Sequence, residues 1–152
     1  MATTLTKIYI HLVFHIKKNC TYIREEDLPE VFAYIGGLIS NAKSIPLVVG
    51  GINDHVHILF TLPKTMCLAD FVRYIKSNSS KWIKSKGNYY KWFSWQDGYG
   101  AFSVSASVVD KTIEYIRNQQ KHHETISYID EYKQFLEMYK IRYDENFAFD
   151  DF

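Results

Sequence analysis

The sequence predicts an α+β fold: a ferredoxin-like β-α-β-β-α-β core with an added C-terminal helix that carries a tyrosine. Short segments in which apolar residues alternate with others indicate strands, and two long segments with apolar residues at helical spacing indicate the core helices. The order of these segments is the third observation, because it matches an antiparallel sheet with both helices on one face. In this topology the first and third strands are the central pair, and the other face of the sheet is open.

The expected elements follow the chain in order. Residues 8–16 alternate and predict the first strand, and a helix is expected over 25–42, ending before Ser44-Ile45-Pro46. Further strands are expected over 47–49, 55–60 and 102–105, and further helices over 68–86, 108–123 and 128–138, before a loosely docked tail over 147–152. The length suits one domain, 1–152, with the core over 5–107, the tyrosine helix over 108–124 and a C-terminal extension over 125–152.

Composition excludes several classes of protein. The chain is 47% hydrophobic and 16% aromatic, which is enough for a core and too apolar for disorder. It has no apolar run long enough to span a membrane, and its first residues lack the pattern of a signal peptide. Its two cysteines, Cys20 and Cys67, fit no metal or redox spacing. We therefore expect a cytoplasmic protein with no membrane partner.

The net charge of +1 conceals a basic central segment. Residues 71–96 contain no Asp or Glu, and their cations are interleaved with tryptophan, tyrosine and phenylalanine. Cations can neutralise phosphates and aromatic rings can stack on unpaired bases, so this segment favours a nucleic-acid surface over an ordinary solvated helix face. The candidate DNA-binding residues are Arg73, Lys76, Lys81, Lys84 and Lys86.

Two histidines stand two residues apart in the segment Asp54-His55-Val56-His57. Successive side chains of a strand point to opposite faces, so His55 and His57 share one face while Val56 enters the core on the other. Imidazoles placed in this way can share one metal ion, and Asp54 could orient one of them. His11 and His15, on the first strand, lie on the same predicted open face.

The predicted helix over 108–123 holds a second set of candidate residues. Tyr115 and Gln119 are four residues apart and share a face that lies away from the apolar stripe of this helix. A glutamine carbonyl could complete a metal site begun by the histidine pair, and a deprotonated phenol is a competent covalent nucleophile. His122 and His123 are expected to be solvated residues at the helix end.

These motifs together resemble the single-tyrosine HUH transposases of small insertion sequences, including the repeat-associated tyrosine transposases. The resemblance covers residues 5–145. It is carried by His55-Val56-His57 after Gly50-Gly51-Ile52-Asn53-Asp54, by Tyr115-Ile116-Arg117-Asn118-Gln119, by the approach segment 95–105, and by the opening strand that ends in His11-Leu12-Val13-Phe14.

The resemblance implies a DNA transposase that cuts and rejoins single-stranded DNA at insertion-sequence ends. It implies that His55, His57 and Gln119 hold Mg²⁺ or Mn²⁺ and that Tyr115 attacks the scissile phosphate to form a 5′-phosphotyrosine. No nucleotide cofactor is implied, because the phosphotyrosine stores the bond energy. Implied partners are a DNA hairpin near each element end and a second copy of the chain in a homodimer, acting at the nucleoid. Whether Tyr115 acts in cis or in trans is left open.

Two alternatives remain at this point. A domesticated module that binds single-stranded DNA or a hairpin without transposition is expected to lack Tyr115, Gln119 or a histidine of the pair, and all are present. A metal-dependent hydrolase that activates water needs a further base near the metal, and Leu59 stands where a third alternating histidine would be.

Overall fold

The computed structural model describes residues 2–145. The elements of the core are β1 (Tyr9–His15), α1 (Leu28–Asn41), β2 (Pro46–Ile52), β3 (His55–Thr61), α2 (Leu68–Ser85) and β4 (Gly100–Val104), and they are followed by α3 (Val109–Arg117), α4 (Gln119–His122) and α5 (Tyr128–Met138). The order confirms the predicted β-α-β-β-α-β core with C-terminal helices. The predicted tail over 147–152 lies outside the described residues.

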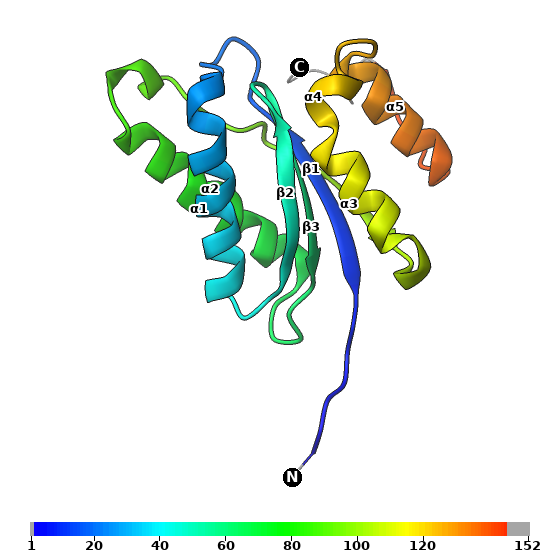
Figure 1. Cartoon of the computed structure of the whole chain (residues 1–152). Helices are drawn as coiled ribbons and strands as arrows, with labels where there is room; N and C mark the ends of the chain where they lie inside the picture. The colour runs from blue at the N-terminus through cyan, green and yellow to red at the C-terminus, as the bar shows by residue number, and fades with distance from the viewer. Residues whose placement is uncertain (1, 146–152) are drawn as a thin grey trace.

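The four strands form one antiparallel sheet in the order β2-β3-β1-β4. The predicted central pair, β1 and β3, is therefore confirmed. Their register places His15 opposite His55 and Val13 opposite His57. In Figure 1, α1 and α2 lie on one side of this sheet and α3, α4 and α5 on the other.

The main core lies between the sheet and the first two helices. Apolar residues at helical spacing line one side of α1, and α2 has a similar stripe that includes Phe71 and Ile75. They meet the strand residues that point away from the histidines, such as Phe14, Val56 and Ile58, which are fully buried. Each such side chain contributes roughly 1.5–3 kcal/mol to folding, so this layer holds β1 and β3 in place.

The second face of the sheet is also covered, so the expectation of an open face is wrong. Val13 and Leu59 point to this side and are 1% and 0% exposed. Helix α3 approaches β2 so closely that a Cβ added at Gly50 would lie 2.7 Å from the carbonyl oxygen of Ile116. Apolar side chains remain on this face after α1 and α2 have packed, and the C-terminal helices bury them.

On the same face of the sheet, aromatic rings pack α5 against β4, the edge strand opposite β2. Phe102 of β4 and Phe135 of α5 stack with ring centroids 5.0 Å apart. Val13, Phe102 and Tyr128 form a small cluster, against which Tyr132 and Phe135 pack. Helix α5 is thereby held over the central strands, next to the histidines.

The helix predicted over 108–123 is divided into α3 and α4. The break is at Asn118, whose backbone angles of −95° and 17° lie outside the helical region. Asn118 still donates its backbone N–H to the carbonyl of Glu114, and its own carbonyl accepts from His122. The turn changes the direction of the chain while keeping Tyr115 and Gln119 on the side that faces the sheet.

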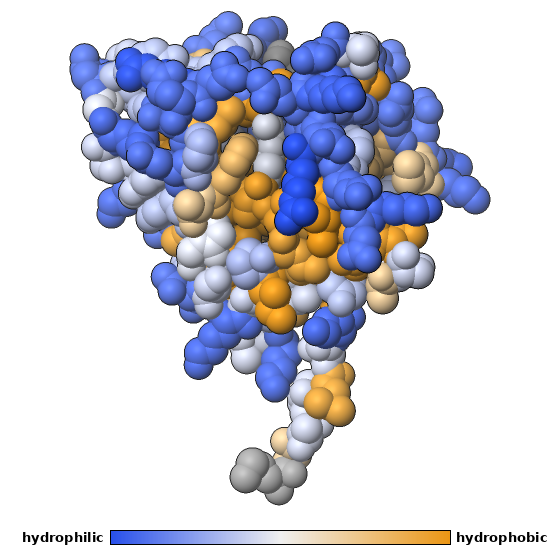
Figure 2. Space-filling view, viewed as in Figure 1, coloured by the Kyte–Doolittle hydropathy of each residue, from blue (hydrophilic) through white to orange (hydrophobic). Residues whose placement is uncertain are grey.

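Figure 2 shows apolar side chains gathered over the middle of one face of the molecule, within a hydrophilic rim. In the matching view of Figure 1, the strand β2 runs through this region between α1 and α3. β2 is an edge strand, and most of its residues are only partly buried. Among residues 2–145, no helix combines the length and the apolar character that a bilayer crossing requires.

Candidate active site

The histidine pair lies at the centre of the molecule, between the sheet and the C-terminal helices. His55 and His57 are both 0% exposed, because they project from a central strand into the layer covered by α3, α4 and α5. Their ring centroids are 5.1 Å apart. The alternation of β3 therefore places both imidazoles on one face, as predicted, although that face is closed to solvent in this chain.

Each histidine of the pair has a partner that holds its ring. Nδ1 of His55 lies 2.7 Å from a carboxylate oxygen of Asp54, which can only accept, so this nitrogen carries the proton and donates. With the proton on Nδ1, the lone pair of the ring lies on Nε2, which is the nitrogen that a metal would bind. Nδ1 of His57 lies 2.8 Å from Nε2 of His11. The predicted orienting role of Asp54 matches this geometry. Because neutral His57 donates from Nε2 to the Glu131 carboxylate, its Nδ1 accepts from the Nε2–H of His11, which holds the second ring.

Two groups from the C-terminal helices meet the histidine pair. Oε1 of Glu131, on α5, lies 2.9 Å from Nε2 of His57 and 3.7 Å from Nε2 of His55. Nε2 of His123, which directly follows α4, lies 3.3 Å from the same carboxylate oxygen. The predicted solvated position of His123 is wrong, because its side chain is only 5% exposed. Packing of α5 over the sheet, which helical periodicity could not show, draws His123 inward.

This donor set fits a metal ion. One ligand atom each from His55, His57, His123 and Glu131 lies within 4.8 Å of all the others. Bonds of about 2.1 Å in a tetrahedral site separate neighbouring ligand atoms by about 3.4 Å. The Nε2–Oε1 distances of 2.9, 3.3 and 3.7 Å to the Glu131 carboxylate bracket that value. A divalent ion therefore requires only small side-chain movements, and the three imidazoles and one carboxylate already converge.

Gln119 joins the same group through its amide. Its carbonyl oxygen lies 3.1 Å from Nε2 of His55 and 2.9 Å from Nε2 of His123, and its NH₂ donates to Glu131 at 3.2 Å. The side chain is buried, and its oxygen faces the Nε2 atoms of both His55 and His123. The sequence-predicted set of His55, His57 and Gln119 is therefore together in space.

Charge and burial set the protonation of the cluster. Burial lowers the pKa of His57 to about 4, a shift that the neighbouring Glu131 only partly offsets, so His57 is neutral near pH 7. Burial also lowers the pKa of His11 well below its usual value, helped by His57. Burial alone would raise the pKa of Glu131, but hydrogen bonds from His123 and His57 bring it far below the usual range. Burial alone would lower the pKa of His123, but its hydrogen bond to Glu131 and the charge of that carboxylate raise it. The centre thus presents a carboxylate anion at Glu131 and a neutral imidazole at His57, which are the forms that bind metals.

Tyr115 lies beside this cluster in the same chain. Its ring centroid is 5.8 Å from that of His57 and 5.2 Å from that of His122. The phenol donates a hydrogen bond to the Glu131 carboxylate. Burial, followed by the negative charge of Glu131, raises the pKa of Tyr115 above its usual value. The candidate nucleophile and the histidine pair are therefore brought together within one chain, and the raised pKa keeps the phenol protonated beside the Glu131 carboxylate.

Sequence reasoning missed Glu131 and the inward position of His123. Glu131 is 1% exposed and lies on the apolar side of α5, because Tyr128 three residues before it and Phe135 four residues after it share that side. A carboxylate on the apolar stripe of an amphipathic helix is the signal that could have found it, because such a group is buried only when paired. The four-residue spacing of Gln119 and His123 is a weaker signal of the same kind.

The predicted DNA-binding residues lie on α2 and just after it, on the opposite side of the sheet from the histidine cluster (Figure 1). Nζ of Lys76 donates to the backbone carbonyls of Gln96 and Gly98 at 2.5 and 2.8 Å. Lys86 is paired with Glu30 and Asp27. These two lysines hold the loop after α2 and the start of α1. The other members, Arg73, Lys81 and Lys84, are exposed on α2.

Comparisons with known proteins agree with this architecture. A structure solved as a candidate transposase of Deinococcus radiodurans R1 is similar with a TM-score of 0.60 and 19% identity, over 78% of this chain and 95% of that one. A repeat-associated (REP) tyrosine transposase bound to a REP hairpin is similar with a TM-score of 0.58 and 12% identity, over 83% of this chain and 74% of that one. At these identities the likenesses establish the fold.

The family itself is established by sequence. No curated protein matches the chain. A family model for IS200-like transposases matches residues 4–119. This span includes β1, Tyr115, Gln119 and β3 with its two histidines. The match and the fold support the same conclusion, and this chain belongs to the IS200-like transposase family.

Proposed function

We propose that this chain cuts and rejoins single-stranded DNA at insertion-sequence ends, with Tyr115 as the nucleophile and a divalent metal at the histidine cluster. The observation that carries the proposal is the convergence, in one chain, of the Tyr115 hydroxyl and the His57 Nε2 atom on the carboxylate of Glu131. A phenol next to a metal-binding cluster is the arrangement that phosphoryl transfer to tyrosine needs.

In the first step the oxygen of Tyr115 forms a bond to the scissile phosphorus, and the bond from phosphorus to the 3′ oxygen breaks. The phenol loses its proton and the 3′ oxygen leaves as a hydroxyl, so the DNA 5′ end is held as a phosphotyrosine. In the second step another 3′-hydroxyl attacks the same phosphorus and releases Tyr115. Bond energy is conserved throughout, so no nucleotide cofactor is needed.

His55, His57, His123, Glu131 and Gln119 are the residues that would hold the metal. When bound, a divalent ion polarises the phosphoryl oxygen and stabilises the charge that develops during transfer. Asp54 and His11 keep the rings of the histidine pair oriented through their Nδ1 atoms. Mg²⁺ and Mn²⁺ are the proposed ions, and the imidazole-rich donor set favours Mn²⁺, because Mg²⁺ prefers oxygen ligands.

The proposed DNA partner is a single strand with a hairpin at the element end. A REP hairpin is bound by the tyrosine transposase whose fold this chain shares, and the exposed cations Arg73, Lys81 and Lys84 are candidates for such contacts. A homodimer is also proposed, and the partly exposed apolar edge strand β2 supports it. Reaction on chromosomal DNA places this activity in the cytoplasm, at the nucleoid.

The test uses single-stranded DNA from both sides of the gene that encodes this chain, incubated with the full-length protein and Mn²⁺ or Mg²⁺. A denaturing gel then reports a covalent protein–DNA adduct. We expect an adduct with the wild-type chain and with Tyr34→Phe, whose ring stacks on Trp82 in the layer of the first two helices. We expect none with Tyr115→Phe or with EDTA.

An adduct that persists in Tyr115→Phe would assign the nucleophile elsewhere. Tight binding of the hairpin strand with no adduct under any metal would replace the proposal with a domesticated DNA-binding module. Adduct formation unaffected by EDTA would remove the metal from the mechanism.

A further inference from the structure

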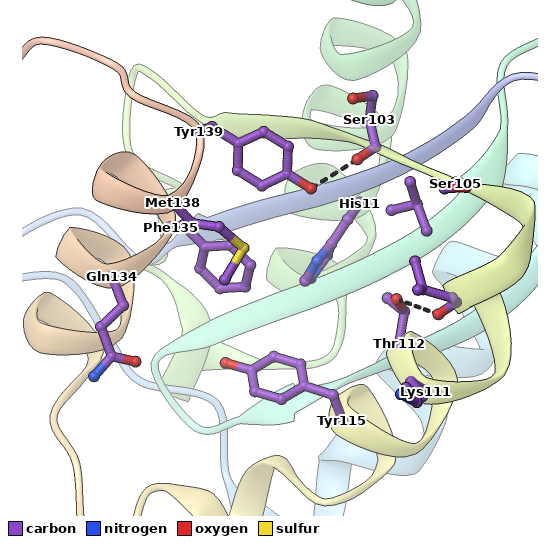
Figure 3. Close-up of a pocket in the computed structure, with 12 residues that line it drawn as sticks. His11, Ser103, Ser105, Lys111, Thr112, Tyr115, Gln134, Phe135, Met138 and Tyr139 are labelled. Atoms are coloured by element: carbon purple, nitrogen blue, oxygen red, sulfur yellow. Dashed lines mark hydrogen bonds between the residues drawn. The ribbon is translucent and has the colours of Figure 1, made fainter.

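A cavity of about 500 Å³ opens beside the phenol of Tyr115, away from the histidine cluster. Its walls come from the end of β4, the first turns of α3 and the last turns of α5 (Figure 3). Tyr115 and His11 line the side nearest the metal-binding cluster. A cavity of this size accepts a small organic group, and it shares the side chains of Tyr115 and His11 with the edge of the candidate reaction centre.

Aromatic and apolar side chains form the α5 wall of the cavity. Phe135 lies with its ring centroid 5.1 Å from His11 and 6.0 Å from Tyr115. The hydroxyl of Tyr139 donates to the backbone carbonyl of Ser103 at 2.7 Å, which fixes that ring at the rim. Met138 is 70% exposed, although it faces this cavity. An apolar, aromatic surface left uncovered at a cavity rim indicates a flat, apolar-faced ligand.

The opposite side carries polar groups and one cation next to Val104 and Val108. Lys111 and Thr112 line the cavity from the first turns of α3, and Ser105 lines it from the turn before that helix. Figure 3 shows the Tyr115 ring between this polar side and the α5 wall. Hydroxyl groups and an ammonium on one side, with rings on the other, suit a planar heterocycle joined to an anion.

We propose that this cavity holds one unpaired nucleobase of the DNA strand, that of a nucleotide next to the phosphate that Tyr115 attacks. This inference rests on the proposed function and deepens it. The phosphate must lie at the Tyr115 oxygen for reaction, so the sugars on either side of it place their bases within reach of this cavity. A base turned out of the strand stacks against Phe135 and Tyr139, and its edge meets the hydroxyls of the α3 side.

The consequence is that this chain reads one base at the cut. The wall residues therefore act as specificity determinants, in addition to any contacts with the hairpin. Lys111 is placed to neutralise a phosphate of the same nucleotide.

The experiment combines an abasic strand with a variant that fills the cavity. Single strands from the flanks of the gene carry one abasic sugar at each position around the cut, and binding is measured by fluorescence anisotropy without metal. The variant is Val108→Trp, at a cavity residue that is 39% exposed. The matched control is Ile45→Trp. Ile45 directly precedes β2, is 55% exposed and lines a different cavity.

We expect an abasic sugar at one flanking position to weaken binding about 10-fold or more, as loss of one stacked base does. Val108→Trp should weaken binding of the intact strand by a similar factor and add little when the strand is already abasic there. Such non-additivity shows that the base and the cavity act together. Ile45→Trp should bind like the wild type.

Equal binding of every abasic strand, or full additivity with Val108→Trp, would overturn the inference. If Val108→Trp does not fold, 5-iodouracil at the sensitive position is cross-linked to the wild-type chain. A cross-link on the peptide containing Tyr139 supports the cavity, and one on α2 overturns it. The adduct assay is read separately: failure to form any adduct counts against the proposed function, whereas base-independent binding counts against the cavity alone.

Discussion

Gly50→Ala is the substitution that tests how the phenol is positioned. Gly50 pairs with His57 in the sheet and lies beneath α3. The added Cβ would lie 2.7 Å from the carbonyl oxygen of Ile116 and 2.9 Å from its Cγ2 atom. The carbonyl belongs to the backbone of α3, so it cannot rotate away as a flexible side chain could.

The size of the effect follows from that distance. Ordinary contacts begin at 3.4 Å, so α3 must retreat from β2 by about 0.7 Å. Overpacking of this kind costs about 1–3 kcal/mol of unfolding free energy. Tyr115 precedes Ile116 on the same helix and moves with it. Because a misplacement of about 1 Å can cost about 100-fold in rate, we expect adduct formation to slow by about 10- to 100-fold.

Two measurements check this prediction. Urea denaturation gives the change in stability, and single-turnover adduct formation with saturating DNA and Mn²⁺ gives the change in rate. The matched control is Gly37→Ala, at an exposed position in α1 where an added Cβ meets nothing within 4 Å. The control should raise stability by about 0.5–1 kcal/mol and leave the rate unchanged.

The reasoning is refuted if Gly50→Ala keeps the wild-type rate, since α3 would then not hold the phenol against β2. A loss of stability with an unchanged rate of adduct formation by the folded fraction would have the same meaning.

Three further predictions concern the histidine cluster and the core. Glu131→Gln should lower Mn²⁺ affinity by about 10- to 100-fold, measured by calorimetry, because a charged ligand becomes a neutral one; unchanged affinity would exclude Glu131 as a ligand. Without metal, the unfolding free energy should be greatest above pH 6.5 and fall towards pH 4. In this range His57 binds a proton in the unfolded chain but stays neutral in the folded chain, where burial lowers its pKa to about 4. The difference between the ordinary histidine pKa of 6.5, expected in the unfolded chain, and the pKa of about 4 in the folded chain corresponds to a loss of about 3 kcal/mol of unfolding free energy. Urea titrations of His57→Gln should therefore show a shallower pH dependence. Tyr90→Phe should cost about 1–3 kcal/mol in the same assay, because the backbone N–H of Arg24 and the carboxylate of Asp27 both lose a part-buried hydrogen-bond partner.

Much of the fold was predictable because its signals are local. The alternation in β1 and β3 and the helical stripes of α1 and α2 identify the elements and their buried faces from neighbouring residues alone. The boundaries agree well: the helix expected over 128–138 is α5, and that expected over 68–86 is α2 with one residue more. The same period-two rule placed His55 and His57 on one face.

The sequence by itself therefore determined the order of elements, the paired histidines and the grouping of Tyr115 with Gln119. Only the tertiary structure decided that the second face is closed, that Tyr115 lies beside His57 in the same chain, and that Glu131 and His123 join the cluster. The physical reason is that helix and strand periods constrain residues a few positions apart, whereas 74 residues separate His57 from Glu131. Their contact depends on α5 burying its aromatic side against β1 and β4, and no spacing within the chain specifies which strands that side will meet.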